Sequence, residues 1–318
     1  MTLPIHTQFL QLTFTRGGRL LPWLGPALRG IVAGTLKNRV CRQPPIQREL
    51  QWKFCRGCPH NQECAYGLTY EPEPPDDRTV LKAAADGQRA VTLTPYFPAP
   101  LEGHAGDRLQ VRLLLLGQRA IGAASAVVDA MAEAGKTKGF GQDEIAFQVQ
   151  PTHVPSWPAG QVNLRPMDLG RQYDPSLGVL PWVRLELTSP LFLKEGAQGQ
   201  AGQPVRNPGF DHLLRASLRV VGRAFAVFGE GCLEEQVDFA GLKAAAERVS
   251  TQTAAWEPFR QSHHSRRGRS RYELTGLTGN AVFTDVPVSM LPWLVWGGRL
   301  GVGEHRVAGA GTWHLLVL

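Results

Sequence analysis

Hydrophobic and polar residues alternate over residues 7–15, TQFLQLTFT, as they do in a half-buried β-strand. Pro26 then opens a helical pattern that places Leu28, Val32 and Leu36 on one face. The later patterns of this part predict strands at 90–97 and 108–116, a helix at about 119–134 and a strand at 144–150. The order strand, helix, strand, strand, helix, strand is that of a ferredoxin-like domain.

A second cycle of elements begins after residues 151–181, which are rich in Pro, Gly and Asn and show no period. Its predicted elements are a strand at 182–194 with a proline break, a helix at 209–228, a long strand or hairpin at 271–284, a short helix at 288–296 and a closing strand at 312–318. The pattern therefore predicts an α+β protein with two tandem ferredoxin-like (RRM-like) domains, at 1–150 and 182–318, joined by a linker at 151–181.

Composition fits two soluble domains and excludes a membrane protein. The chain has 318 residues, 43% of them hydrophobic, and no run of eighteen apolar residues. The N-terminal stretch MTLPIHTQFLQLTF lacks the features of a signal peptide, so we expect a cytoplasmic protein. The net charge of +7 comes mainly from arginine, whose guanidinium fork suits phosphate recognition.

Two basic or glycine-rich segments near the C-terminus predict contacts with RNA. Residues 260–271, RQSHHSRRGRSR, contain no acid, and their arginines are the predicted phosphate contacts: Arg260, Arg266, Arg267, Arg269 and Arg271. A glycine-rich loop follows within 297–311, where backbone N–H groups and two basic side chains are expected to approach the RNA: Gly301, Gly303, His305, Arg306, Gly309 and Gly311. The same glycines are also compatible with a tight fold-back between the last helix and the last strand.

Four of the five cysteines lie close together in the sequence, as C-x13-C-x2-C-x5-C. In a cytosolic protein such a cluster favours metal binding over disulfides, so Cys41, Cys55, Cys58 and Cys64 are candidate ligands of a structural zinc ion. His60 is a substitute ligand, and reduced thiols in a loop are the alternative. The cysteine-rich segment, residues 41–66, is predicted to be an insertion in the first domain.

The motifs resemble those of the CRISPR precursor-RNA-processing endoribonucleases of the RAMP superfamily, the Cas-six family, in a cysteine-containing variant. Four stretches carry the resemblance, in order along most of the chain: LPWLGPALRGIVAGTLKNRVC with FCRGCPHNQECAYGLTYEP; DRLQVRLLLLG with GFGQDEIAFQV; VRLELTSPLFLKEG with FDHLLRASLRVVGRAF; and SHHSRRGRSRYELTGLTGNAVF with LGVGEHRVAGAGTWHL.

The resemblance implies paired ferredoxin-like domains in a prokaryotic, cytoplasmic enzyme that cuts CRISPR repeat RNA. In this family the 2′-hydroxyl of a ribose attacks the neighbouring phosphate without a metal and leaves a 2′,3′-cyclic phosphate. The enzyme is expected to remain on the product as a subunit of an effector complex, with other CRISPR proteins as partners. Catalysis is thus expected to need no cofactor, and zinc would be structural.

The sequence departs from the family at the first helix, where many members carry a catalytic histidine and residues 20–40 contain none. Arg29 and Lys37 are the cations predicted to face the scissile phosphate from this helix. His263 and His264, inside the arginine cluster, are the candidate general base and acid, since nearby positive charge keeps a histidine neutral. Two alternatives stay open: a non-catalytic RAMP subunit that caps one end of the guide RNA, and a zinc-dependent RNA-binding module.

Overall fold

The computed structural model describes most of the chain: residues 2–43, 55, 57–73, 88–141, 143–154, 159–195, 202–229, 233, 236–265 and 270–318, without the side chains of 264, 265 and 270–272. The chain forms two compact units. The N-terminal unit comprises Leu3–Asn163 with Val227–Gly229, and the C-terminal unit comprises Leu164–Ala226 and Glu230–Leu318 with Met1–Thr2. Among the described residues, none of the helices has both the length and the apolar character needed to cross a bilayer.

The sheet of the N-terminal unit has the strand order β3-β5-β1-β6, with β7 also paired to β1. The strands are β1 (Leu3–Phe14), β3 (Val91–Pro95), β5 (Arg108–Leu116), β6 (Phe147–Thr152) and β7 (Gly160–Leu164). β1 and β5 are antiparallel, with Leu10 opposite Val111. Leu10 and Val111 are buried together with Leu12 and Phe147, so the alternation read from the sequence reflects one buried sheet face.

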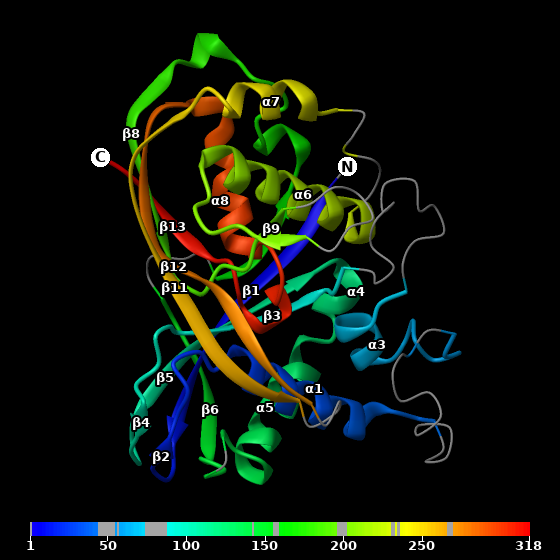
Figure 1. Ribbon diagram of the computed structural model, residues 1–318. Helices are drawn as coiled ribbons and strands as arrows, with labels where there is room; N and C mark the ends of the chain where they lie inside the picture. Colours follow the sequence, from blue (N-terminus) through cyan, green and yellow to red (C-terminus); the bar gives the residue numbers. More distant parts are fainter. Residues whose placement is uncertain are drawn as a thin grey trace. The chain divides into compact units, whose positions relative to one another are not determined.

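The helices α1 (Gly25–Val40) and α5 (Ala124–Thr137) lie side by side and pack on this sheet (Figure 1). Pro26 occupies the first turn of α1, where its missing N–H costs nothing. Gly135 lets α5 approach β6 closely, because a Cβ there would lie 2.3 Å from the carbonyl oxygen of Phe147. The smaller elements are α3 (Ala65–Tyr70), α4 (Gln118–Ile121) and the pair β2 (Gly18–Arg19) with β4 (Glu102–Gly103).

The sheet of the C-terminal unit has the strand order β11-β12-β8-β13. Its strands are β8 (Val179–Leu187), β11 (Ser250–Ser265), β12 (Ser270–Pro287) and β13 (Trp313–Val317). β11 and β12 form a long antiparallel hairpin, drawn in yellow and orange in Figure 1. The sequence did not predict β11, because as an exposed edge strand it has few buried side chains and therefore no apolar alternation, and it contains Pro258.

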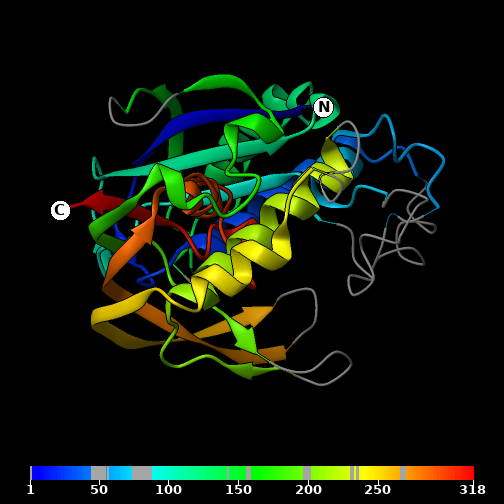
Figure 2. The same cartoon turned by 90° about the horizontal axis from the view of Figure 1, so that it is seen from above.

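Three helices accompany this sheet: α6 (Phe210–Phe228), α7 (Phe239–Ala246) and α8 (Leu291–Leu300), with α6 seen along its length in Figure 2. Phe210 of α6 packs edge-on against Phe283 of β12, with ring centroids 5.4 Å apart. Trp293 of α8 is fully buried. The short elements are β9 (Lys194–Glu195), β10 (Gln203–Pro204), η1 (Pro166–Asp168), η2 (Pro175–Leu177), η4 (Val288–Met290) and η5 (Arg306–Ala308).

Both units follow the β-α-β-β-α-β order with the matching strand orders, so the predicted pair of ferredoxin-like domains is confirmed. The division between the units falls after Asn163, beyond the expected end of the first domain at residue 150. The reason is β7, which pairs with β1 and so belongs to the first sheet. The predicted linker therefore contributes a strand to the first unit.

Candidate functional site

The cations of α1 have different surroundings. Arg39 is neutralised by Glu133, at 3.0 Å, and by Asp129, at 3.8 Å, both on α5. The Nζ atom of Lys37 lies 5.1 Å from the centre of the Tyr66 ring, in the geometry of a cation–π contact. Lys37 therefore points toward α3 and lines the cysteine pocket described below.

Arg29 is half-buried on α1, and no acid within the described ranges forms an ion pair with it. Its charge acts on the phenol of Tyr70, which is buried and has no hydrogen-bond partner for its oxygen among the described residues. Burial raises the pKa of Tyr70, and the positive charges of Arg29 and Arg89 oppose that rise. Unlike Arg39, Arg29 thus has no acid among the described residues to neutralise its charge.

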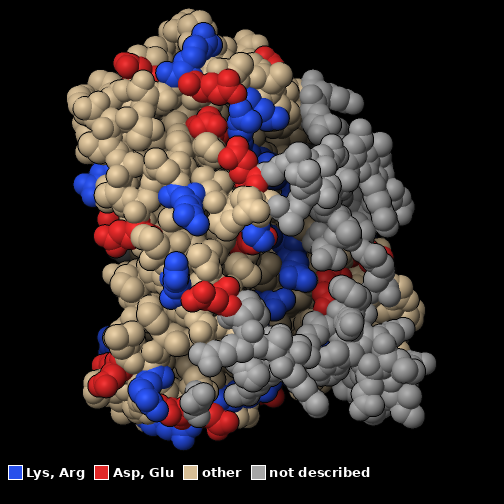
Figure 3. Space-filling view, viewed as in Figure 1, with Lys and Arg blue, Asp and Glu red and all other residues tan. Residues whose placement is uncertain are grey.

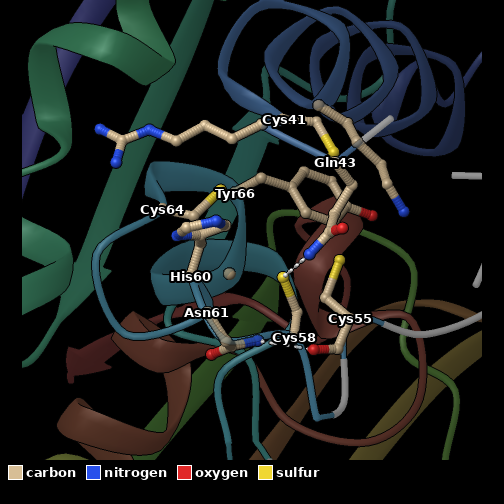
Figure 4. Close-up of a pocket in the computed structure, with 11 residues that line it drawn as sticks. Cys41, Gln43, Cys55, Cys58, His60, Asn61, Cys64 and Tyr66 are labelled. Carbon is tan, nitrogen blue, oxygen red and sulfur yellow. Dashed lines mark hydrogen bonds between the residues drawn. The ribbon is translucent and has the colours of Figure 1, made fainter. Parts of the chain in front are cut away.

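The four clustered cysteines come together around one pocket in the N-terminal unit (Figure 4). Cys41 directly follows α1 and Cys64 directly precedes α3, so the two helix ends carry the first and the last thiol. Cys55, Cys58 and His60 complete this side of the pocket. The four cysteines that are close in the sequence thus line one pocket, and all four are free thiols.

Burial is the main reason why the pKa of Cys55 rises to about 12, and the neighbouring carboxylate of Glu71 raises it further. Lys37 opposes this shift. Without a bound cation, Cys55 is accordingly a thiol at neutral pH. Gln43 donates a hydrogen bond from Nε2 to the sulfur of Cys58, at 3.3 Å. Within the described part of the chain, no three His, Cys, Asp or Glu side chains are already arranged to hold a metal ion.

Two of the predicted RNA-binding arginines, Arg260 and Arg271, lie on the paired strands β11 and β12. Arg260 is exposed on β11, and the register pairs His264 with Arg271 next to the closing pair Ser265 and Ser270. Arg266, Arg267 and Arg269 lie outside the described residues, as do the side chains of His264 and Arg271. The described residues of the basic segment thus lie on two adjacent antiparallel strands.

His263 is half-buried and shares a face of β11 with Phe259 and Gln261, because side chains of a strand alternate between faces. Phe259 and Gln261 are buried, with 8% and 6% exposure. The Phe259 ring contacts Phe192 edge-on at 6.2 Å. His263 therefore lies about 13 Å further along the same strand face, four residues beyond Phe259.

The glycine-rich loop is tightly packed, both within itself and against Phe192. A Cβ on Gly303 would lie 2.2 Å from the carbonyl oxygen of Phe192, and one on Gly311 would lie 2.0 Å from that of Val302. Both have positive φ, +76° and +69°, which only glycine adopts freely. Arg306 is buried, with 8% exposure, and Gly301, Gly309 and Gly311 are buried as well. Gly303 and His305 are the predicted members of the loop that face solvent.

His305 has a left-handed backbone, with φ +59° and ψ +17°. Its exposed imidazole stands edge-on to Phe192, with ring centroids 5.0 Å apart. The amide of the adjacent Glu304 donates to the carbonyl of Phe192 at 2.9 Å, and its carboxylate pairs with Lys194 at 2.9 Å. A strained backbone position held by such contacts is typical of a functional residue.

Changing His305 to glycine should give a more stable protein than changing it to alanine. Both changes remove the imidazole, but only alanine keeps a Cβ in the left-handed region, which costs about 1 kcal/mol. Thermal unfolding of the two variants measures the difference. Equal midpoints would contradict the left-handed backbone of residue 305.

Two arginines of α6, outside the predicted RNA-binding segments, are further candidate anion contacts. Arg219 is exposed and Arg223 half-buried, and neither pairs with an acid among the residues that the structure describes. Burial and the positive charge of Arg219 both lower the pKa of Arg223. The sequence does contain a sign of this basic helix face: Arg215, Arg219 and Arg223 are spaced four residues apart, which puts them on one side of a helix. Arg215 differs because it pairs with Glu247 and Asp211.

Basic and acidic side chains are interspersed over the described part of the face in Figure 3. The net charge of the chain is therefore not spread as one uniform basic surface there. Binding of an anion would therefore depend on local groups of basic residues, such as those of the β11–β12 hairpin, rather than on the total charge.

Comparisons with known proteins concern the family and the fold. The family model AF_1859_N, an N-terminal domain, matches residues 3–163. No curated protein sequence matches the chain. A solved Cas6 product complex is similar at a TM-score of 0.56 and 16% identity, covering 99% of this chain and 100% of that one. Thermus thermophilus Cas6 is similar at a TM-score of 0.50 and 13% sequence identity, covering 99% of each chain. A partial Cas6-RT-Cas1–Cas2 complex is similar at a TM-score of 0.56 and 12% sequence identity, covering 99% of this chain and 46% of that one.

Proposed function

The chain belongs to the AF_1859_N family, and we propose that it is a metal-independent endoribonuclease that cuts CRISPR repeat RNA and remains bound to the product. One observation carries the proposal. The fold matches the whole length of both chains in the comparison with a Cas6 product complex, so both ferredoxin-like units, and not a single common domain, are shared. Arg260, exposed on the β11–β12 hairpin of such a scaffold, is suitably placed to contact a phosphate backbone.

The proposed reaction is attack by a ribose 2′-hydroxyl on the adjacent phosphorus, with departure of the 5′-oxygen. A 2′,3′-cyclic phosphate and a 5′-hydroxyl result. The protein must hold the attacking oxygen, the phosphorus and the leaving oxygen in line. A base takes the proton of the 2′-hydroxyl and an acid gives one to the leaving oxygen, and histidine titrates in the range that suits both steps.

Each group of candidate residues supplies one of these needs. His263 and His264 adjoin the arginine-rich end of the hairpin, and are the proposed base and acid. Arg29, with no ion pair to an acid in the described ranges, is the proposed cation that offsets charge on the phosphate. Lys37 is held over Tyr66, and its proposed contribution is therefore limited to long-range charge.

The proposed partners are the repeat RNA, its processed product and other subunits of a CRISPR effector complex. The solved complex that joins Cas6 with RT, Cas1 and Cas2 supports the assembly of this fold with further proteins. Exposed apolar residues such as Trp182 and Leu316, both in the C-terminal unit, are available for protein contacts.

Incubating the purified chain with a labelled repeat RNA in EDTA tests the proposal. We expect a single cut within the repeat and none in an unrelated hairpin of equal length. A cut that requires added Mg²⁺ would overturn metal independence, and multiple cuts in both RNAs would overturn the specific function.

The second candidate function is a non-catalytic subunit that caps one end of the guide RNA. It is favoured by the absence of histidine from α1, where many members of the resembling family have their catalytic histidine. Tight, repeat-specific binding without any cut in the same assay would support this function in place of the nuclease.

A further inference from the structure

The cysteine pocket is of the size and chemistry of a metal site. Its cavity of about 30 Å³ has room for a single ion or for one or two waters. Four thiols and one imidazole line it, and no carboxylate does so among the described residues: Cys41, Cys55, Cys58, Cys64 and His60. Soft sulfur donors with nitrogen select zinc over the hard cations, which prefer oxygen.

The backbone brings these thiols together by a series of turns. The amide of Cys58 donates to the carbonyl of Cys55 at 3.1 Å, and the amide of Cys64 donates to the carbonyl of His60 at 2.8 Å. Asn61 between them is buried, with 2% exposure. Its amide side chain donates to the carbonyls of Cys55, at 3.2 Å, and of Glu71, at 2.9 Å. The loop that carries three of the thiols is therefore folded around a buried polar centre.

The loop is also pressed against α3. Gly67 of α3 touches it so closely that a Cβ there would lie 2.5 Å from the carbonyl oxygen of Asn61. The amide of Cys41 donates to the carbonyl of Lys37, at 3.0 Å, and so fixes the first thiol at the last turn of α1. The first thiol thus lies at the end of α1 and the last thiol at the start of α3.

The charges around the pocket match a four-thiolate zinc site. A zinc ion with four thiolates carries a net charge of about −2. Lys37 and Arg42 line the same pocket and would offset that charge. Two acids lie nearby as well: the Glu71 carboxylate accepts a hydrogen bond from the amide of Cys55, and the Glu63 carboxylate lies 3.9 Å from the guanidinium of Arg42.

We propose that Cys41, Cys55, Cys58 and Cys64 bind one structural zinc ion, which ties the end of α1 to the start of α3. Because no three ligand side chains among the described residues already form a metal-binding group, zinc binding must draw the four thiolates inward from their positions around the cavity. The zinc takes no part in RNA cleavage. The zinc ion fixes the end of α1 that carries Lys37. This structural role is separate from the proposed cleavage of RNA.

The test is the metal content of the full-length protein, purified from zinc-supplemented cells without chelator. We expect one zinc per chain by mass spectrometry, loss of zinc in the double variant Cys55→Ser/Cys58→Ser, and full retention in Cys232→Ser. Replacing zinc with Co²⁺ should give thiolate charge-transfer absorption and tetrahedral ligand-field bands. His60→Ala should leave that spectrum unchanged, since four thiolates complete the shell.

Two results would overturn the proposal. One is a zinc content far below one per chain with no Co²⁺ spectrum in the wild-type protein. The other is a disulfide among the four cysteines, found by counting free thiols in the intact protein. If the double variant fails to fold, the zinc count and the Co²⁺ spectrum of the wild-type protein still decide. RNA cleavage is a separate readout, so the nuclease proposal and the zinc proposal can each fail alone.

Discussion

Changing both His263 and His264 to alanine should slow cleavage of the repeat RNA by about 10²-fold to 10⁴-fold while leaving RNA affinity within a few-fold of wild type. General acid–base catalysis by a positioned histidine contributes rate increases of this size. His263 lies on β11 and His264 pairs with Arg271 in the register, so both adjoin the predicted phosphate contacts. Single-turnover cleavage and equilibrium binding of the same RNA separate the two effects.

His104→Ala is the matched control, because His104 is an exposed histidine of a turn in the N-terminal unit, close to Asp107 at 3.5 Å. It should cleave at the wild-type rate. An unchanged rate in the hairpin variant would remove the two histidines from the chemistry and leave His305 as the next exposed candidate. Equal losses of rate and affinity would show that they only contact phosphate.

Changing the five hairpin arginines to glutamine should lower RNA affinity by about 10²-fold or more and flatten its dependence on salt. These arginines are Arg260, Arg266, Arg267, Arg269 and Arg271. Each phosphate contact with a single strand adds about 0.7 to the slope of log affinity against log salt, so five contacts account for about 3 to 4. Charge-assisted contacts of this kind are also individually strong.

Arg39→Gln is the control for this series, since Arg39 is already paired with Glu133 and Asp129 and should leave the salt slope unchanged. An unchanged slope in the five-arginine variant would place the RNA elsewhere. The same titration on Arg219→Gln/Arg223→Gln would then show whether these two arginines of α6 are the contact.

Strong periodicity made most of the fold predictable. In β1 every second residue from Leu10 to Phe14 is buried, and in α1 the buried residues recur at helical spacing, so both repeats are visible in the sequence. β11 escaped prediction because its stability comes from backbone pairing with β12, which leaves no trace in the order of apolar side chains. β7 was assigned to a linker for a similar reason, since three of its five residues are exposed.

The sequence predicted which residues belong to the candidate site better than it predicted which neighbours those residues contact. The cysteine spacing alone indicated a cluster, because short turns bring such residues together. The sequence could not show that Arg39 is neutralised while Arg29 has no acid partner among the described residues, since the pairing of Arg39 depends on α5, about a hundred residues away in the chain. It also could not show that Arg306 is buried among the glycines that surround it.

The most direct measurement compares a labelled repeat RNA with the same RNA carrying one 2′-deoxyribose at the cut site, both in EDTA. The account predicts one cut in the natural RNA, a 2′,3′-cyclic phosphate on its 5′ fragment, and no cut in the deoxy RNA despite equal binding. Equal cutting of both RNAs, or a free 3′-hydroxyl on the product, would contradict attack by the 2′-hydroxyl and with it the proposed function.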